Sequence, residues 1–477
     1  PNKNIKMIIG NKKITLGDKF SVVNPYTKKI VAKVLNANKK LIKSALNKSF
    51  KFECKLNSET RAAILMKTAA EINRSKYKYA NIIVNELGVS FKDAIYEVER
   101  VIECAKVSAQ VCKNIDKDIT KKFIMHRQYK PKLKVISEPL DLVLAITPFN
   151  LPMILAAHKI FPAIVAGTSI VLKPSEKSPL SSIKLLETLI KNGLPPNMVN
   201  IITGKNGKKT ISNILSNSFI DVISFTGSLP VGKEIKKMLI KKNHFLKKFI
   251  PELGGCSSLI ICSDCDLNKA VDIAIDGCFK YSGQRCTSVR RVIVEKKIAD
   301  KFIKQLLTKV KKIKFGNPYN KDTDLGPLIN ELEAKNIQGK INASLKKGAK
   351  LLYGNKRKNS LLSPTVLDKV RLNMSIVSSE TFGPICSIIR SNNLKESIQI
   401  AASTNFKIAG SIITRNKKNA VKAANELKVG QFSINGPPGY RTELAPFGGF
   451  GDSGSGEKEG IILSAENMRR IRVIYEH

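Results

Sequence analysis

Short apolar runs alternate with segments of helical apolar spacing along most of this chain. In the first half, four runs predict buried strands, at Leu142–Ile146, Ile170–Lys173, Val199–Thr203 and Val222–Phe225. In the second half, five more runs predict strands, at Leu259–Cys262, Val292–Glu295, Pro384–Ile389, Gly410–Thr414 and Phe432–Asn435. Strand–helix alternation is typical of a parallel, doubly wound sheet. The two series therefore predict two α/β domains, which agrees with a chain of 477 residues.

The flanking segments follow other patterns. Apolar residues recur at helical spacing over Ser58–Leu87 and Phe91–Cys112, and a short apolar run at Ile5–Gly10 predicts N-terminal strands. The charged segment Lys121–Pro139 is strand-like, and the alternating run Arg469–Tyr475 suits the same small sheet.

Charge adds one question. The net charge is +44, from 82 Lys and Arg against 38 Asp and Glu, which is compatible with nucleic-acid binding. The basic residues are spread along the chain and not interleaved with aromatic residues, and Trp is absent. We interpret the charge as a compositional bias and predict no specific nucleic-acid partner.

Cysteine usage and hydropathy bear on location. The nine cysteines have no regular spacing, which favours reduced thiols in the cytoplasm. Cys262 and Cys265 form one isolated CxxC, so we predict no metal site. The first residues lack the apolar segment of a secretory signal, and Leu140–Leu172 is broken by prolines and charges, so we predict no membrane span.

The stretch FKYSGQRCTSV, at Phe279–Val289, holds the strongest candidate for chemistry. Cys286 has small and polar neighbours, unlike a cysteine that serves only packing. Gly283 allows close backbone approach, and we expect Arg285 to favour the thiolate, which is the reactive form. The pattern predicts a nucleophile.

Two further residues suit a nucleophilic mechanism. Glu252, in PELGG, is expected on a tight turn, where it could serve as a base. Asn150 closes TPFN just after the apolar run Leu142–Ile146, and its amide could donate to a developing oxyanion. Taken singly, each is equally compatible with an ordinary loop acid or turn asparagine.

A phosphate-binding turn is predicted at Phe225–Gly232, although the chain has no GxGxxG. Here a strand runs into a helix, whose start offers free N–H groups and a positive dipole end to a pyrophosphate. Gly227 permits an unusual turn, and Lys173-Pro174-Ser175-Glu176 follows another predicted strand.

Taken in order, and with Glu380-Thr381-Phe382-Gly383-Pro384 and Pro446-Phe447-Gly448-Gly449, these motifs resemble the aldehyde dehydrogenase superfamily along nearly the whole chain. The resemblance implies an α/β fold of two doubly wound parallel-sheet domains plus a small β oligomerisation element. It implies a dinucleotide-binding domain at 1–116 and 136–252, a catalytic domain at 253–447 and an oligomerisation element at 117–135 and 462–477. A homodimer or homotetramer is implied as well.

The same resemblance implies the roles of the site residues. Cys286 would attack an aldehyde, the Asn150 amide and the Cys286 N–H would hold the oxyanion, and Glu252 would activate water to hydrolyse the thioester. The implied cofactor-binding residues are Thr147, Phe149, Lys173, Glu176, Gly227, Ser228, Gly232, Glu380 and Phe382. Glu176 favours NAD because a carboxylate repels the 2′-phosphate of NADP, and NADP stays open. Glu176 could also simply stabilise a helix start.

The segment Ile434–Glu443 is similar to a loop of phosphonoacetaldehyde dehydrogenases, and Gln284–Thr287 recurs in non-phosphorylating glyceraldehyde-3-phosphate dehydrogenases. We therefore predict a short, anionic, phosphonoacetaldehyde-like substrate held by Arg285 and Arg441, with Arg100 as a further contact. Leu151 and Gly451 depart from that pattern. Lactaldehyde, glyceraldehyde-3-phosphate and succinate semialdehyde stay open as substrates.

Two alternatives concern the activity itself. An acyl-coenzyme-A-forming enzyme is disfavoured by Glu252, which that branch generally lacks. An inactive binding homologue that uses its basic surface is disfavoured by the intact Cys286, Asn150 and Lys173.

Overall fold

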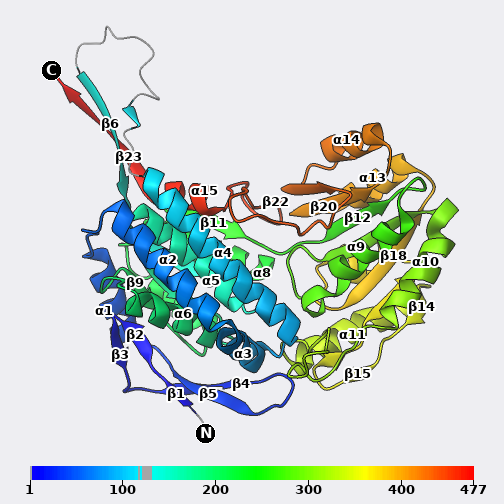
Figure 1. Cartoon of the computed structure of the whole chain (residues 1–477), viewed down its shortest axis with the longest axis horizontal. Coiled ribbons are helices and arrows are strands. Elements are labelled where there is room, and N and C mark those ends of the chain that lie inside the picture. The colour runs from blue at the N-terminus through cyan, green and yellow to red at the C-terminus, as the bar shows by residue number, and fades with distance from the viewer. Residues whose placement is uncertain (1–2, 116–118, 121–131) are drawn as a thin grey trace.

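The computed structural model describes residues 3–115, 119–120 and 132–477. Two lobes lie side by side, each built around a sheet with helices packed on it (Figure 1). A ribbon of two strands, β6 (Lys132–Pro139) and β23 (Arg469–Glu476), projects from the first lobe and carries the C-terminus.

The first lobe is built on a five-stranded sheet with strand order β11-β10-β7-β8-β9, in which all neighbours run parallel. Its strands are β7 (Leu142–Ile146), β8 (Ser169–Lys173), β9 (Val199–Ile201), β10 (Val222–Thr226) and β11 (Lys248–Glu252). Every residue of β7 and β8 is buried, as continuous apolar runs require when helices cover both faces. The four predicted strands are confirmed, and β11 was missed.

Helices surround this sheet. They are α1 (Lys39–Phe50), α2 (Ser58–Arg74), α3 (Lys76–Leu87), α4 (Phe91–Ile115), α5 (Pro152–Ala166), α6 (Leu180–Lys191), α7 (Gly207–Ile214), α8 (Leu229–Lys241) and α15 (Ile461–Asn467). The predicted helix at Ser58–Leu87 is in fact two helices, because the chain breaks at Ser75. Five short strands precede α1, at β1 (Lys3–Ile5), β2 (Met7–Ile9), β3 (Lys12–Ile14), β4 (Lys19–Val23) and β5 (Ile30–Leu35).

The second lobe holds a seven-stranded sheet with strand order β14-β17-β18-β13-β12-β20-β21. Only the β14–β17 pair among these neighbours is antiparallel. Its strands are β12 (Ser257–Ile261), β13 (Val289–Glu295), β14 (Lys350–Tyr353), β17 (Thr365–Asp368), β18 (Ile385–Ser391), β20 (Ala409–Ile413) and β21 (Gln431–Ile434). The five predicted strands are confirmed, and the edge strand β14 and its neighbour β17 were missed.

The helices of the second lobe are α9 (Leu267–Phe279), α10 (Lys296–Val310), α11 (Glu331–Lys346), α12 (Ser375–Ser378), α13 (Leu394–Ala402) and α14 (Lys417–Glu426). A 3₁₀ turn, η2 (Lys280–Gly283), follows α9 directly. The small pairs β15 (Arg357–Lys358) with β16 (Leu361–Leu362), and β19 (Phe406–Lys407) with β22 (Phe450–Gly451), complete the fold.

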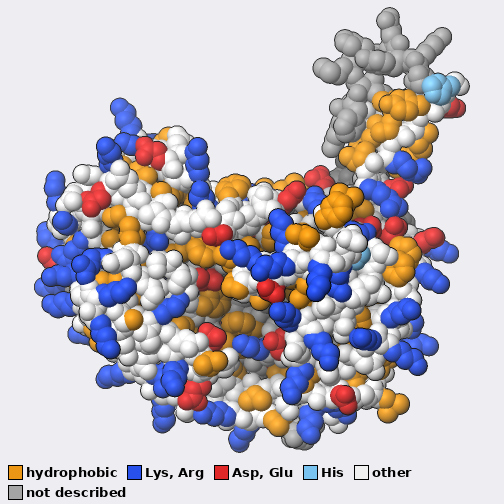
Figure 2. Space-filling view, turned by 180° about the vertical axis from the view of Figure 1, so that it is seen from behind, with side chains coloured by type: hydrophobic (Ala, Val, Ile, Leu, Met, Phe, Trp, Pro, Cys, Tyr) orange, Lys and Arg blue, Asp and Glu red, His pale blue; other side chains and the backbone are white. Residues whose placement is uncertain are grey.

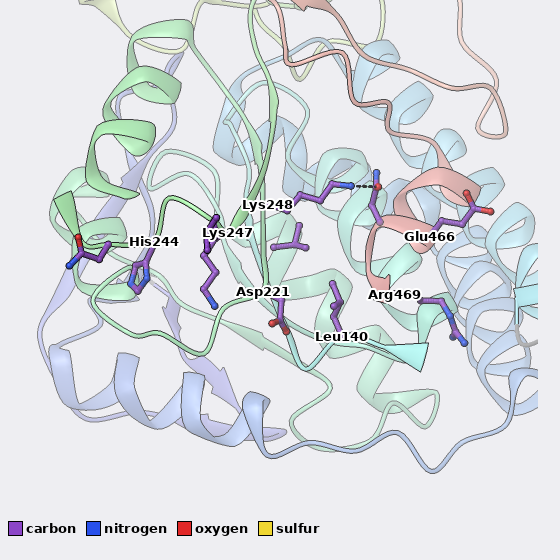
Figure 3. Close-up of a pocket in the computed structure, with 11 residues that line it drawn as sticks. Leu140, Asp221, His244, Lys247, Lys248, Glu466 and Arg469 are labelled. Carbon is purple, nitrogen blue, oxygen red and sulfur yellow. Dashed lines mark hydrogen bonds between the residues drawn. The ribbon is translucent and has the colours of Figure 1, made fainter. Parts of the chain in front are cut away.

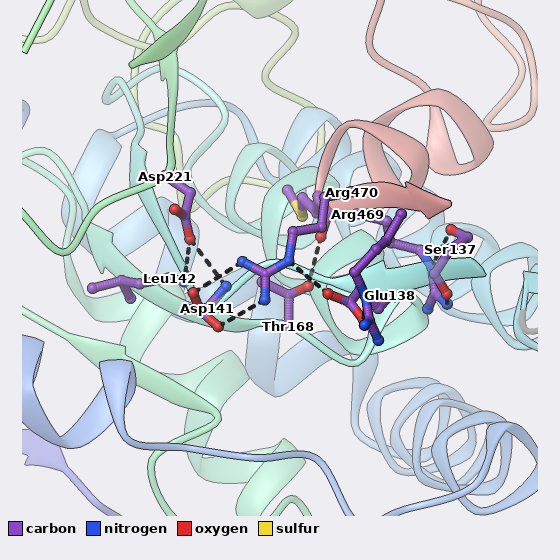
Figure 4. A network of polar contacts seen from close by, with 10 residues as sticks. Ser137, Glu138, Asp141, Leu142, Thr168, Asp221, Arg469 and Arg470 are labelled. Atoms are coloured by element: carbon purple, nitrogen blue, oxygen red, sulfur yellow. Dashed lines mark hydrogen bonds and ion pairs between the residues drawn. The ribbon is translucent and has the colours of Figure 1, made fainter. Parts of the chain in front are cut away.

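The projecting ribbon is tied to the first sheet by polar contacts (Figure 4). Arg470 donates to Glu138 at 2.9 Å and to Asp141 at 3.1 Å, and the Asp221 carboxylate accepts from the N–H groups of Asp141 and Leu142. The predicted pairing of the C-terminal run is confirmed, because β23 pairs antiparallel with β6. The remainder of the predicted strand-like segment, at 121–131, lies outside the described residues. The domain limits stay a prediction.

Lys and Arg side chains are scattered over the face in Figure 2 and do not gather in one patch. Among the residues that the structure describes, no helix is long and apolar enough to cross a membrane. No disulfide joins any of the cysteines in the part of the chain that the structure describes.

Candidate active site

A cavity of about 460 Å³ brings together residues from both lobes. The sequence-predicted residues that line it are Phe149, Asn150, Gly227, Ser228, Glu252, Cys286, Glu380, Phe382 and Arg441. The three residues predicted to carry the chemistry therefore share one cavity, although 136 positions separate Asn150 from Cys286 in the sequence (286 − 150).

Cys286 lies just after η2 and is half-buried. Burial raises the pKa of its thiol to about 11, Glu380 and Glu252 raise it further, and Arg441 and Arg285 oppose them. Arg285 acts in the predicted direction, because its charge lowers the pKa of the Cys286 thiol. Its guanidinium donates to the Asp276 carbonyl at 2.7 Å, and desolvation outweighs its charge.

Asn150 follows β7 at the carboxyl end of the first sheet. Its side chain is buried, and its amide nitrogen donates to the Gln284 carbonyl at 2.8 Å. Because Gln284 is two residues before Cys286, this bond holds the amide beside the thiol. The Asn150 NH2 group has two N–H donors, so one can stay on the Gln284 carbonyl while the other donates to an oxyanion.

Glu252 is the last residue of strand β11. The expectation that it lies on a tight turn is therefore wrong. Neither carboxylate oxygen has a hydrogen-bond partner among the described residues. Burial raises the pKa of Glu252 well above its usual range, and the nearby Glu459 raises it further. Gly448 has φ of +152°, and a Cβ there would come within 2.4 Å of the Glu252 side chain, so only glycine fits.

A buried ion pair behind Glu252 was missed by the sequence analysis. The Lys159 ammonium donates to Glu459 at 2.7 Å and to the Ser224 hydroxyl at 2.7 Å, and both charged residues are buried. Glu459 also lines the cavity. A lysine inside the otherwise apolar helix α5 was a usable signal, because such a charge is buried only with a partner.

Near the start of helix α8, some buried polar groups make no hydrogen bond with the described residues. Among the described residues, the buried hydroxyl of Thr226 has no hydrogen-bond partner and Ser228 makes no capping bond, and the Thr147 hydroxyl, just outside the cavity lining, is likewise unpaired there. Helix α8 begins here, so its unpaired N–H groups can hold a phosphate. Gly232 lies inside this helix, where a Cβ would come within 2.7 Å of Leu253, so packing also favours glycine there, and its predicted contact with the cofactor stays a prediction.

Lys173 and Glu176 lie together, with 3.3 Å between the ammonium and a carboxylate oxygen. They do not line the cavity of about 460 Å³ that holds Cys286, which we call the main cavity. Glu176, Lys177 and Lys205 border a separate cavity of about 470 Å³. The residues present therefore fit a dinucleotide that spans the α8 turn and reaches this second cavity.

Glu380 and Phe382 face the same main cavity from the second lobe. Glu380 accepts from the Gly255 N–H at 3.0 Å. Phe382 packs edge-to-face against Phe149, with 6.1 Å between ring centroids. This aromatic pair joins the lobes across the cavity.

The three predicted substrate arginines have different surroundings. Arg441 lines the main cavity, lies 4.3 Å from the centre of the Phe447 ring and makes no hydrogen bond or ion pair with the described residues. Arg285 and Arg100 do not line that cavity. Arg100 donates twice to Glu443, at 3.0 and 2.8 Å. The predicted clamp of Arg285 and Arg441 is therefore not assembled in the structure.

Glu443 organises a second buried cluster that the sequence analysis did not anticipate. It accepts from Arg100 and lies 2.6 Å from His158, and Cys104 is nearby. These contacts hold the pKa of Glu443 well below its usual range, and burial lowers that of His158 to about 4. Cys104, His158 and Glu443 could also approach a metal ion, but Arg100 already occupies the carboxylate.

A further cavity of about 580 Å³ lies away from these residues, between the first sheet and the projecting ribbon (Figure 3). Its lining includes Asp221, His244, Lys247, Lys248 and Arg469, none of which belongs to a predicted site. Lys248 donates here to Asn467 at 2.7 Å.

The two-lobed fold and the shared cysteine, glutamate and asparagine cavity define an aldehyde-oxidising enzyme. The chain belongs to the aldehyde dehydrogenase family, whose sequence profile matches residues 13–474. The protein is an NAD(P)-dependent aldehyde dehydrogenase, and the expected superfamily and fold are confirmed.

Curated relatives and solved structures agree with this assignment. A lactaldehyde dehydrogenase from Methanococcus aeolicus is 36% identical over 471 residues, covering 95% of this chain and 96% of the relative. A 3-sulfolactaldehyde dehydrogenase from Priestia aryabhattai is 32% identical over 467 residues, covering 96% and 95%. The crystal structure of betaine aldehyde dehydrogenase from Staphylococcus aureus in complex with NAD+ has a TM-score of 0.91 at 27% identity, covering 98% and 94%.

Proposed function

We propose that this enzyme oxidises a short 2-hydroxyaldehyde of the lactaldehyde class to its carboxylic acid, with NAD as the preferred cofactor. The supporting observation is that Cys286, Asn150 and Glu252 share one cavity in a chain similar to lactaldehyde dehydrogenases over nearly its full length. The relatives favour lactaldehyde over the phosphonoacetaldehyde that the loop around Arg441 predicts.

The first chemical step belongs to Cys286. Its thiol must lose a proton before it attacks the aldehyde carbon, because the pKa of about 11 keeps it protonated at neutral pH. The thiohemiacetal oxyanion that forms is held by the second N–H of the Asn150 amide, whose first N–H stays on the Gln284 carbonyl, and by the Cys286 N–H. When bound, a nicotinamide would supply the acceptor for the hydride that leaves the substrate carbon.

The second step belongs to Glu252. The thioester on Cys286 must be hydrolysed, and Glu252 takes a proton from the attacking water. A buried carboxylate without hydrogen-bond partners has a raised pKa, which makes it a stronger base. The Lys159–Glu459 pair lies on the far side of Glu252 and influences that pKa through its charges.

The preference for NAD is supported by Glu176, whose carboxylate would meet a 2′-phosphate of NADP at close range. Lys177 and Lys205 border the same cavity, so NADP stays open as a weaker cofactor. The similar betaine aldehyde dehydrogenase structure holds NAD+.

A second substrate candidate is an anionic member of the same class, such as a 3-sulfolactaldehyde. One observation favours it: Arg441 faces the cavity with no carboxylate paired to it. A relative named 3-sulfolactaldehyde dehydrogenase is consistent with this. A cation in a partly dry cavity favours an anion there.

We also propose that the enzyme forms an oligomer, because apolar side chains are exposed on its surface. Apolar side chains are exposed on β23, at Ile471, Val473 and Tyr475, and next to α8, at Phe245 and Leu246. Exposed apolar groups of this kind favour association, which supports a homodimer or homotetramer.

Activity assays test the proposal. Purified enzyme is expected to reduce NAD with lactaldehyde, and Cys286→Ala is expected to abolish the reaction. The panel includes 3-sulfolactaldehyde, phosphonoacetaldehyde, glyceraldehyde-3-phosphate and succinate semialdehyde, each with NAD and with NADP. Full activity of Cys286→Ala, or turnover of none of these aldehydes, would contradict the proposal.

A further inference from the structure

The backbone just before Cys286 has an unusual conformation. Tyr281, Ser282 and Gly283 have φ angles of +56°, +53° and +69°, all in the left-handed region. Residues other than glycine rarely adopt this conformation, and they keep it only where surrounding contacts impose it. The contacts of this segment, which we call the left-handed segment, therefore decide where the Cys286 thiol lies.

The C-terminal part of the segment is held from within the second lobe. The Ser282 hydroxyl donates to the Gly326 carbonyl at 2.8 Å, and Arg290 donates to the Gly283 carbonyl at 2.6 Å. A Cβ at Gly283 would come within 2.0 Å of the Gly383 carbonyl oxygen, so this packing requires glycine.

Tyr281, in contrast, is held by the first lobe. Its N–H donates to the Asp93 carboxylate at 3.1 Å, and its hydroxyl donates to the Asp93 backbone carbonyl at 2.7 Å. The tyrosine is 1% exposed and belongs to the hydrophobic core formed by α2, α4 and α5. A residue five positions before the thiol is thus part of the core of the opposite lobe.

Helix α4 also contacts the segment that follows the oxyanion donor Asn150. Asp93 and Glu97 are four residues apart, so they lie on the same face of α4. Glu97 accepts from the N–H groups of Met153 and Ile154, at 2.8 and 3.1 Å, which fixes the start of α5 just after Asn150. One helix therefore holds both the segment that carries the thiol and the segment that carries the oxyanion donor.

We propose that Asp93 and Tyr281 form a latch between the lobes that sets the distance between the Cys286 thiol and the Asn150 amide. The two are positioning residues, because neither lines the main cavity. The proposal rests on the proposed role of Cys286 as the nucleophile. Loosening the latch frees the left-handed segment to relax, which moves the thiol away from the oxyanion donor without touching the cofactor residues.

The test uses Tyr281→Phe, which removes only the hydroxyl that binds the Asp93 carbonyl. Tyr79→Phe is the matched control, since Tyr79 also donates or accepts one buried hydrogen bond, at 2.7 Å to Thr188, in the same hydrophobic core. A third variant, Asp93→Ala, removes the carboxylate that accepts from the Tyr281 N–H. Each variant is measured for melting temperature, kcat, KM for NAD, and the rate of Cys286 alkylation by iodoacetamide, followed by peptide mass spectrometry.

We expect Tyr281→Phe to lower kcat and to change the alkylation rate by about three- to tenfold, the size of one buried hydrogen bond. KM for NAD is expected to stay unchanged, and Asp93→Ala to have the larger effect. Tyr79→Phe is expected to lower the melting temperature by a similar amount and to leave kcat and alkylation unchanged.

Two outcomes separate this proposal from the proposed function. If Tyr281→Phe and Asp93→Ala behave like Tyr79→Phe, the latch is refuted while Cys286 can still be the nucleophile. If Cys286→Ala keeps full activity, the proposed function itself fails. The alkylation rate reports on the position of the thiol even where no substrate is turned over.

Discussion

Replacing Arg441 with methionine tests how the cavity chooses its substrate. Methionine keeps most of the apolar stem that packs on Phe447 and removes the charge. The Arg441 guanidinium makes no hydrogen bond or salt bridge with the described residues, and Glu443 and Glu459 act on it only through their charges, so an anionic substrate would be the first group to bond it directly. A neutral aldehyde makes no ionic contact with that charge and depends on it only through the pKa of Cys286, which Arg441 lowers.

The expected size follows from the contacts available. A charge-assisted hydrogen bond contributes about 1.5–3 kcal/mol, and truncating one side of a buried charge pair costs about 2–5 kcal/mol. A loss of ~3–4 kcal/mol corresponds to a drop of about 10²- to 10³-fold in kcat/KM for 3-sulfolactaldehyde. For lactaldehyde, kcat/KM is expected to change by less than about fivefold.

The assay compares kcat/KM for the two aldehydes at saturating NAD in the parent enzyme, Arg441→Met and Arg285→Met. Arg285→Met is the matched control, because its guanidinium donates to the Asp276 carbonyl and does not line the cavity. We expect the anionic aldehyde to lose rate in Arg441→Met alone. Equal losses for both aldehydes, or a larger loss in Arg285→Met, would refute the argument from the unpaired charge.

Two further predictions concern the buried acids. Glu252 must be a carboxylate to act as a base, so activity rises with pH through its pKa, and the negative charge of Glu459 raises that pKa. Glu459→Gln is therefore expected to move the acid limb of the kcat–pH profile to lower pH, whereas an unchanged or higher limb would count against the charge coupling. Glu176→Gln is expected to raise the ratio of kcat/KM for NADP over NAD by about tenfold, the effect of ~1.4 kcal/mol of like-charge repulsion. An unmoved ratio in steady-state assays would remove Glu176 from cofactor selection.

Much of the fold could be predicted because buried parallel strands leave a clear mark. A strand covered on both faces, such as β7, is a continuous apolar run. β11 and β14 were missed for the opposite reason. They start with exposed lysines and lie at sheet edges, where one side needs no apolar residues. The Ser75 break was missed because the apolar spacing continues across it.

The candidate site was also predictable only in part. The motifs around Cys286, Glu252 and Asn150 placed these residues in one site before any geometry was known. Their charge states could not be predicted, because burial and neighbours from distant elements decide them. Lys159 and Glu459 meet across 300 positions, and no local pattern records that contact.

Tyr281 and Asp93 illustrate why a positioning role escapes sequence reasoning. Asp93 is one acid in a helix of mixed composition, and Tyr281 is one aromatic residue before the polar loop. Only the left-handed backbone and the contact across the lobes distinguish them.

The central claim is that an acyl group is carried on the sulfur of Cys286 and released by water that Glu252 activates. Glu252→Gln mixed with lactaldehyde and NAD, quenched in acid within one turnover and digested, tests it directly by peptide mass spectrometry. The account predicts a lactyl thioester on the peptide that contains Cys286, together with a burst of NADH and slow turnover afterwards. An acyl group on another cysteine, or rapid turnover with no adduct and no burst, would contradict it.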